Sequence, residues 1–298
     1  MIHNSQIIFD SHTHVHFPAY DQDRDVVVKR AQEAGVKMIT VGTNLQTSKE
    51  AIAIAEKYPE DIWATVGFHP THISESPSEA QKSEGRTSQW YYDKNELRQP
   101  IQEKFYEVEL RKISSHPRVV AIGECGLDYY RIKNDELGIK KRQKEFFLEQ
   151  VEIAKDLKKP LMIHCRPSKG TDDAYEDLLN ALSSQDLTAL RRRLIMHFFV
   201  GSLPIAKKLL EAGCCFTFGG VITFVRDYDE VIKYLPLESI LLETDAPYVA
   251  PEPYRGKRNE PAYVVEVAKK IAETKNISLE EVINTTTSNN KKLFDLIF

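Results

Sequence analysis

The chain has 298 residues, of which 42% are hydrophobic and 28% are charged, so it can bury a large apolar core. Its 40 Lys and Arg and 44 Asp and Glu give a formal net charge of −4. This balance excludes a uniformly basic nucleic-acid coat protein but permits a local basic patch. No run of about 18 apolar residues is present, which excludes a membrane span. The first ten residues lack a basic-then-apolar leader and the four cysteines form no CxxC pair, which favours a cytoplasmic protein without disulfides.

Short apolar runs alternate with longer amphipathic segments along the chain. The runs are Ile7–Ser11, Met38–Thr43, Ile62–Phe68, Val119–Gly123, Leu161–His164, Leu194–Phe199, Cys215–Phe218 and Ile240–Thr244. The segments with helical periodicity include Asp25–Ala34, Lys49–Tyr58, Phe105–Ser114, Gln143–Leu157, Ala174–Leu182, Pro204–Ala212 and Asp229–Tyr234. Strands joined through helices must be parallel, so this order predicts an α/β protein with a (β/α)8 TIM barrel. An open doubly wound sheet is the alternative, but no GxGxxG follows the first strand.

One segment breaks this alternation. Ser74–Pro100 is polar and weakly periodic, which predicts an insertion after the third strand. No internal repeat or composition shift marks a second domain. We therefore expect residues 1–298 to form a single TIM-barrel domain that acts as a monomer.

Ligand-type side chains recur at the ends of the predicted strands. They are His12 and His14 on the first strand, Glu124 after the fourth, His164 on the fifth, His197 on the sixth and Asp245 after the eighth. In a TIM barrel, the C-terminal ends of all strands meet at one opening, so these six side chains should converge there. A lone histidine at a strand end is more simply a structural residue, but six such groups favour a metal site. Imidazole and carboxylate ligands of this number suit two divalent ions, Mg2+, Mn2+ or Zn2+, that share a bridging carboxylate.

Other polar residues near the strand ends suit substrate binding. His69, in Gly67-Phe68-His69-Pro70, could bind a substrate phosphate or the leaving group, or could simply pack within its loop. Arg166 carries the planar guanidinium that suits a phosphate oxygen. Lys140–Lys144 is a basic cluster that we expect near the rim of the opening. Aromatic residues in the predicted loops could stack on bases or pack locally; they are Tyr129, Tyr130, Phe199, Phe224, Tyr248 and Tyr254.

These residues lie in motifs that resemble the successive signatures of the TatD family of metal-dependent deoxyribonucleases. The motifs are His12-Thr13-His14, Gly67-Phe68-His69-Pro70, Gly123-Glu124-Cys125-Gly126-Leu127-Asp128-Tyr129, His164-Cys165-Arg166 and Glu243-Thr244-Asp245-Ala246-Pro247-Tyr248. The resemblance runs from about Phe9 to the C-terminus, and the fourth-strand and eighth-strand motifs together are specific. By position, the resemblance implies one metal site at His12, His14, Glu124 and Asp245. It implies a second at Glu124, His164 and His197, with Glu124 as the bridge.

The resemblance implies hydrolysis of DNA phosphodiester bonds by metal-activated water, with Asp245 and Glu124 as the catalytic residues. The weak overall basicity favours a short single-stranded or frayed DNA end as substrate, and we expect a 3'-5' exonuclease. The alternative enzyme is an amide or ester hydrolase of the same superfamily, for example on aminoacylated substrates. No predicted strand ends in a lysine that could be carbamylated as a metal bridge, which disfavours a cyclic-amide substrate. A non-catalytic, metal-stabilised scaffold is the remaining alternative.

Overall fold

The eight predicted strands form one parallel sheet in which neighbours in sequence are neighbours in space. The computed structural model describes residues 6–73, 103–130, 132, 137–190 and 192–298. The strands are β1 (Ile8–Thr13), β2 (Val36–Val41), β3 (Ile62–Val66), β4 (Val119–Asp128), β5 (Leu161–Arg166), β6 (Leu194–His197), β7 (Cys214–Phe218) and β8 (Ile240–Leu242). Two backbone hydrogen bonds close the sheet between β1 and the segment after β8. The His14 amide donates to the Ala246 carbonyl at 2.7 Å, and the Asp245 amide donates to the His12 carbonyl at 2.9 Å. The predicted TIM barrel is confirmed; the predicted insertion Ser74–Pro100 lies outside the described residues.

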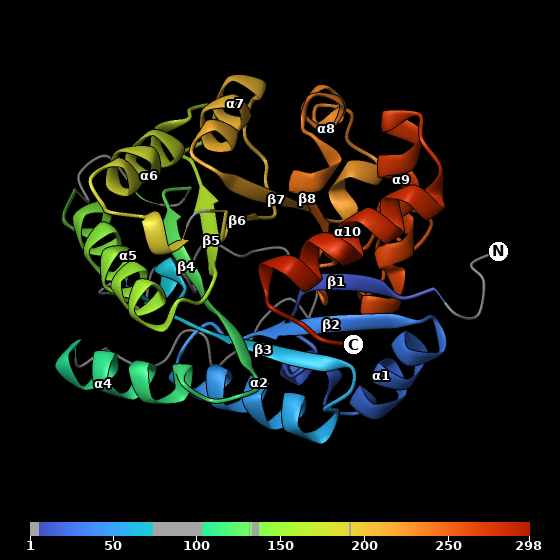
Figure 1. Cartoon of the computed structure of the whole chain (residues 1–298), viewed down its shortest axis with the longest axis horizontal. Helices are drawn as coiled ribbons and strands as arrows, with labels where there is room; N and C mark the ends of the chain where they lie inside the picture. Colours follow the sequence, from blue (N-terminus) through green and yellow to red (C-terminus); the bar gives the residue numbers. More distant parts are fainter. Residues whose placement is uncertain (1–5, 74–102, 131, 133–136, 191) are drawn as a thin grey trace.

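The helices pack around the outside of this barrel (Figure 1). They are α1 (Arg24–Glu33), α2 (Leu45–Lys57), α4 (Glu103–Ser114), α5 (Leu137–Leu157), α6 (Asp173–Ser183), α7 (Leu203–Glu211), α8 (Asp229–Tyr234), α9 (Val264–Lys275) and α10 (Leu279–Leu293). In α2, Asn44 caps the first turn, because its side chain accepts a hydrogen bond from the Thr47 amide at 2.9 Å. In α10, Ser278 caps the helix in the same way through the Glu281 amide. None of the helices in the described ranges has the length and hydropathy needed to cross a bilayer.

The barrel interior is filled by an apolar layer, most of whose strand members lie in the first half of their strands. Its members from the strands are Phe9, Ile39, Val41, Trp63, Ala121, Met162, Ile195 and Leu241. Leu293, Phe294 and Leu296 belong to the same cluster, and the Phe298 ring stacks on Phe9 with centroids 5.8 Å apart. The segment after α10 therefore closes the N-terminal end of the barrel, which leaves the C-terminal end, here called the mouth, for polar groups.

An irregularity in β4 turns one acidic side chain into the barrel. The pairing of β4 with β5 shifts register between Ile122 and Cys125, and both of these residues pack outward in the cluster beneath the helices. Strict alternation would send one of two residues between them inward and the other outward. The extra residue lets Glu124 face the mouth while its neighbours keep their packing, as bulges beside functional sites commonly do. The strand also continues to Asp128, beyond the predicted end at Gly123.

A glycine in the same strand is required by close packing against β5. Gly126 has φ +144°, and a Cβ atom at this position would overlap the backbone carbonyl of His164. Both the conformation and the contact exclude other residues.

We expect Gly126→Ala to lower the free energy of unfolding by about 3 kcal/mol, because the methyl group must displace β5. The control is Gly138→Ala on α5, where no described residue outside the helix backbone places an atom within 4 Å of the new Cβ, so stability should be unchanged or slightly raised. Urea unfolding followed by circular dichroism measures both. Equal stability of the two variants would contradict the packing argument.

Candidate metal centre

Side-chain nitrogen atoms from the end of β1 lie within 4 Å of carboxylate oxygens from β4 and from the segment after β8, in the mouth. The Nε2 atoms of His12 and His14 lie 3.2 Å apart. They lie 3.5 and 3.8 Å from Oε2 of Glu124, and 3.8 and 3.3 Å from Oδ1 of Asp245. This first donor set therefore contains His12, His14, Glu124 and Asp245, the four residues predicted for one metal site.

The second carboxylate oxygen of Glu124 faces a different group of histidines. Its Oε1 lies 2.9 Å from His164 Nδ1, 3.4 Å from His197 Nε2 and 3.3 Å from His69 Nε2. Glu124 itself is 4% exposed. The structure thus brings all six predicted ligand residues together, with Glu124 between two donor sets. Their role as metal ligands stays a prediction.

The first donor set has the chemistry of a cation site. The Nδ1 atom of His14 lies 2.8 Å from the Val41 carbonyl oxygen, which can only accept, so Nδ1 carries the proton and Nε2 of a neutral ring keeps its lone pair. Burial lowers the pKa of His12 to about 3, so its ring is also neutral near pH 7. Imidazole lone pairs and carboxylate oxygens that face one another are stabilised by a divalent ion placed among them.

A buried carboxylate on the segment after β8, that of Glu243, orients His197 of the second donor set. Glu243, fully buried, accepts a hydrogen bond from His197 Nδ1 at 2.8 Å and another from the Thr217 hydroxyl. Burial opposes a charge on His197, but the carboxylates of Glu243 and Glu124 outweigh it and raise the pKa of this histidine to about 10. Glu243 thereby fixes the ring so that Nε2 points at Glu124. In the sequence it lies two residues before Asp245, in the eighth-strand motif.

Asp128 is a further member of the site that we did not predict. Its Oδ2 lies 3.1 Å from Nε2 of His164, whose Nδ1 contacts Glu124. Burial again opposes protonation of His164, but these two carboxylates raise its pKa to about 9. The signal in the sequence was the place of Asp128 in the GE-x-GLD motif, four residues after Glu124. It was missed because β4 was expected to end before it.

The two residues predicted to bind substrate, His69 and Arg166, lie toward the rim. His69 contacts Glu124 through Nε2, while its Nδ1 lies 2.7 Å from the Thr71 hydroxyl. The exposed Arg166 side chain lies over the Tyr130 ring, with Cζ 3.8 Å from the centroid. His16 is buried beside the centre and contacts the Thr40 hydroxyl at 2.7 Å.

The basic cluster Lys140–Lys144 lies within α5, after its start at Leu137, and is largely neutralised by neighbouring acids. Lys140 pairs with Asp173 at 2.9 Å and Lys144 with Asp177 at 3.1 Å, both across to α6. Lys141 lies 3.7 Å from Glu145 on its own helix. These pairs leave the cluster a weak candidate for holding phosphates.

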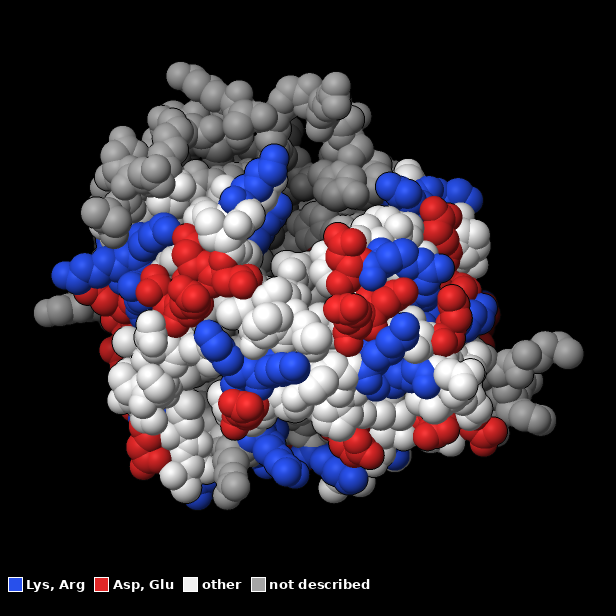
Figure 2. All heavy atoms as spheres, turned by 90° about the horizontal axis from the view of Figure 1, so that it is seen from above, with Lys and Arg blue, Asp and Glu red and all other residues white. Residues whose placement is uncertain are grey.

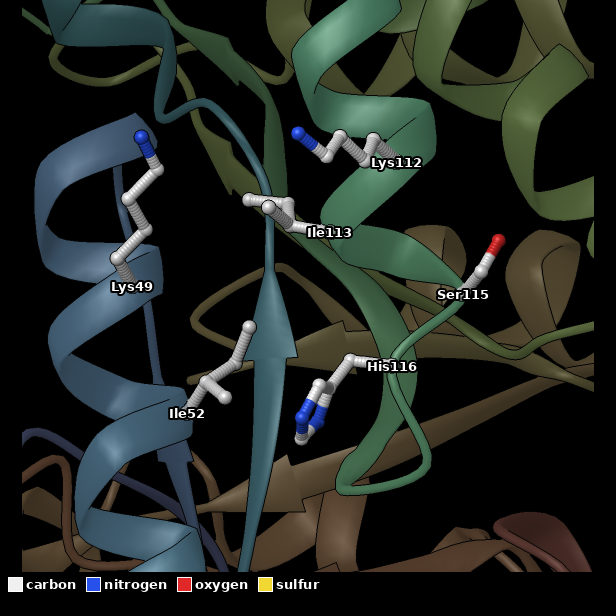
Figure 3. A pocket seen from close by; sticks show the side chains of 6 residues that line it. All are labelled: Lys49, Ile52, Lys112, Ile113, Ser115 and His116. Carbon is white, nitrogen blue, oxygen red and sulfur yellow. The ribbon is translucent and has the colours of Figure 1, made fainter.

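A hollow of about 390 Å³ lies on the outside of the barrel, away from the mouth. Its walls come from α2, with Lys49 and Ile52, and from α4 and the turn after it, with Lys112, Ile113, Ser115 and His116 (Figure 3). His116 is the one histidine among these lining residues, and its Nε2 lies 3.2 Å from Oε1 of Glu56. The hollow is a groove between two outer helices, and no group of candidate metal ligands found in the described part of the chain lies in it.

A closed parallel barrel with imidazoles and carboxylates converging at its C-terminal mouth defines the class of TIM-barrel metal hydrolases. Residues 9–295 match the family model described as TatD related DNase. The chain is 35% identical over 291 residues to "Uncharacterized metal-dependent hydrolase YabD" of Bacillus subtilis, covering 97% of this chain and 99% of that relative. It is 30% identical to "3'-5' ssDNA/RNA exonuclease TatD" of Erwinia tasmaniensis, covering 97% and 100%.

A solved structure agrees with these sequence matches. The crystal structure of the TatD homologue YJJV from Escherichia coli K12 superimposes with a TM-score of 0.76 at 27% identity, covering 97% of this chain and 98% of the other. The chain belongs to the TatD related DNase family.

We expect Glu243→Gln to weaken divalent metal binding by about 10- to 100-fold, because the amide keeps the shape but removes the charge that orients His197. Isothermal titration with Mn2+ or Zn2+ measures the change. The control is Glu273→Gln on the exposed side of α9, which should bind metal as the unmodified protein does. Equal affinities of both variants would show that Glu243 has no influence on the centre.

Proposed function

We propose that this protein hydrolyses phosphodiester bonds of DNA as a 3'-5' exonuclease, with two divalent ions held in the mouth. Mg2+, Mn2+ and Zn2+ all suit the donor atoms. The substrate is a single-stranded or frayed DNA end, and the working unit is one copy of residues 1–298 folded as a single domain. Membership of the TatD related DNase family and the exonuclease name of the Erwinia relative support this proposal.

The position of Glu124 carries the proposal. One of its oxygens faces His12 and the other faces His164, so a single carboxylate serves two donor sets. This arrangement suits a pair of ions that act on one anionic phosphate. By residue, His12, His14, Glu124 and Asp245 would hold one ion, and Glu124, His164 and His197 the other.

Bound divalent ions would neutralise the phosphate charge and lower the pKa of a coordinated water. The chain's own residues do the rest of the chemistry. The Oδ1 atom of Asp245 faces His12 and His14, which leaves Oδ2 to orient the attacking water and accept its proton. The Asp245 side chain is 16% exposed, so it is reached from the mouth. Its φ of +53° lies in the left-handed region that aspartate tolerates better than most residues, and this conformation turns the carboxylate toward β1.

Substrate contacts fall to Arg166 and His69 at the rim. Arg166 would donate through its guanidinium to a phosphate oxygen. His69 presents Nε2 to the mouth because its Nδ1 is engaged with Thr71, and this nitrogen would donate to a phosphate oxygen or to the leaving group. On the face of the molecule seen in Figure 2, acidic and basic side chains adjoin one another among the described residues. The described part of this face therefore offers no continuous basic surface for a long duplex.

Replacing Asp245 with Asn tests the assigned role. We expect turnover to fall by about 10³-fold or more with the fold retained, because the amide cannot accept the proton from water. The assay uses purified protein, labelled single-stranded DNA and circular dichroism as the check on folding. Asp156→Asn on the surface of α5 is the matched control and should keep full activity. Undiminished nuclease activity of Asp245→Asn would reject the assignment.

Metal removal and end protection test the type of reaction. EDTA should abolish cleavage, and Mg2+, Mn2+ or Zn2+ should restore it. An oligonucleotide blocked at its 3' end should resist digestion, while one blocked at its 5' end should be shortened stepwise. Activity toward a panel of amides and esters, without any on DNA, would instead support the alternative hydrolase.

A further inference from the structure

Two arginine–aromatic pairs stand at the mouth outside the metal centre. In the first, Arg166 at the end of β5 lies over Tyr130, which follows β4 and is 44% exposed. In the second, Arg255, in the segment after β8, lies over the ring of Phe224 with Cζ 4.2 Å from the centroid. The Arg255 side chain is 60% exposed. In both pairs the planar guanidinium group is therefore open to solvent, over an exposed ring in the first pair and a partly buried ring in the second.

The strand order puts these pairs at separate places around the mouth. The first pair stands at the ends of β4 and β5, and the second at the ends of β7 and β8. Around the closed barrel they are separated by β6 in one direction and by β1, β2 and β3 in the other. Glu124 and Asp245, on β4 and after β8, lie between them. A chain that crosses the metal centre from one side to the other meets both pairs.

The second pair is built on firmly joined segments. The Glu252 amide donates to the Thr223 hydroxyl at 2.9 Å, which ties the segment after β8 to η4 (Gly220–Thr223), the turn after β7. Gly220 leaves no room for a side chain against the backbone of residues 249–251. Next to Arg255, Tyr254 stacks on Tyr263 with centroids 3.8 Å apart and ring planes 4° apart. The flat surface is thus held in place without a ligand.

The two guanidinium groups keep their charge available. Among the residues that the structure describes, no carboxylate lies within ion-pair distance of Arg166, and the nearest partner of Arg255 is Glu252 at 4.0 Å. Other arginines of this side of the molecule are firmly paired, such as Arg258, which lies 2.6 Å from Asp23. An arginine on an aromatic ring offers a face on which a base stacks and N–H groups at its edge for phosphate.

We propose that these two pairs bind a single DNA strand on either side of the bond that is cut, stacking one base on each pair. This inference rests on the proposed nuclease function. A single strand is the occupant because a duplex hides the faces of its bases, and only a strand with exposed bases matches both the flat guanidinium surfaces and their positive charge.

The experiment compares two substrates with identical phosphates. One is a short single-stranded oligonucleotide. The other is the same strand with abasic residues at its last two positions, at the 3' end. The protein as it exists, loaded with Mn2+, should show a KM about ten-fold lower for the intact strand, because base stacking contributes only there. Phe224→Leu and Tyr130→Leu should each raise KM for the intact strand and so reduce the difference in KM between the two substrates. The value of kcat should change less. Phe224→Tyr should keep the difference in KM between the two substrates, because the aromatic ring is retained.

A matched pair elsewhere on the surface provides the control. Lys207 lies over the ring of Tyr234, 46% exposed, which ends α8 on the side of the barrel away from the mouth. Tyr234→Leu should leave both KM values unchanged. The stacking proposal is wrong if the unmodified protein cuts both strands with the same KM. It is also wrong if Phe224→Leu and Tyr130→Leu keep the full difference in KM between the strands. In either case the nuclease function stands. If neither strand is cut with any metal, the nuclease function itself fails.

Discussion

The site depends on one buried carboxylate shared between two groups of imidazoles. A carboxylate with the 4% exposure of Glu124 costs several kcal/mol to bury unless positive charge or hydrogen-bond donors compensate it. The compensation comes from both directions, because His12 and His14 face one oxygen and the histidines of β5 and β6 face the other. Burial alone would raise the pKa of Glu124, but the surrounding histidines hold it well below its ordinary value. The carboxylate is therefore ionised and ready to bridge positive charges.

The backbone around the closing seam of the barrel keeps the other side of the site in place. Asp10 accepts hydrogen bonds from the Thr244 amide at 2.9 Å and from its hydroxyl at 2.6 Å. The Asn259 amide group donates to the carbonyls of Thr244 and Tyr248 at 2.8 and 2.7 Å. These bonds fix both ends of the turn that carries Asp245, so its carboxylate stays beside β1. Rigid support of this kind is what a site needs when its groups must stand at coordination distance.

The sequence was sufficient to predict the barrel and the six converging residues, because strand–helix alternation and the end positions of His12, His164 and Asp245 follow from local periodicity. Register irregularities were beyond this reasoning: alternation says nothing about the shift that turns Glu124 inward, or about how far β4 extends. Asp128 was missed for that reason. The pairing of the lysines of α5 with acids of α6 also depends on how two helices pack, which no single segment encodes. The close packing that requires Gly126 likewise becomes visible only once β4 lies against β5.

The closure of the barrel by the segment after α10 has a consequence for how the molecule is made. Phe298 stacks on Phe9, and Asn290 accepts a hydrogen bond from the Ser11 hydroxyl at 2.8 Å, so residues nearly 290 positions apart share one interior layer. During synthesis, β1 emerges from the ribosome long before its partners β8 and α10 exist. The interior layer stays open to water until the last of these residues is translated. Such distant contacts slow folding and leave apolar strands uncovered in the nascent chain, so this barrel reaches its final form only after translation of residue 298.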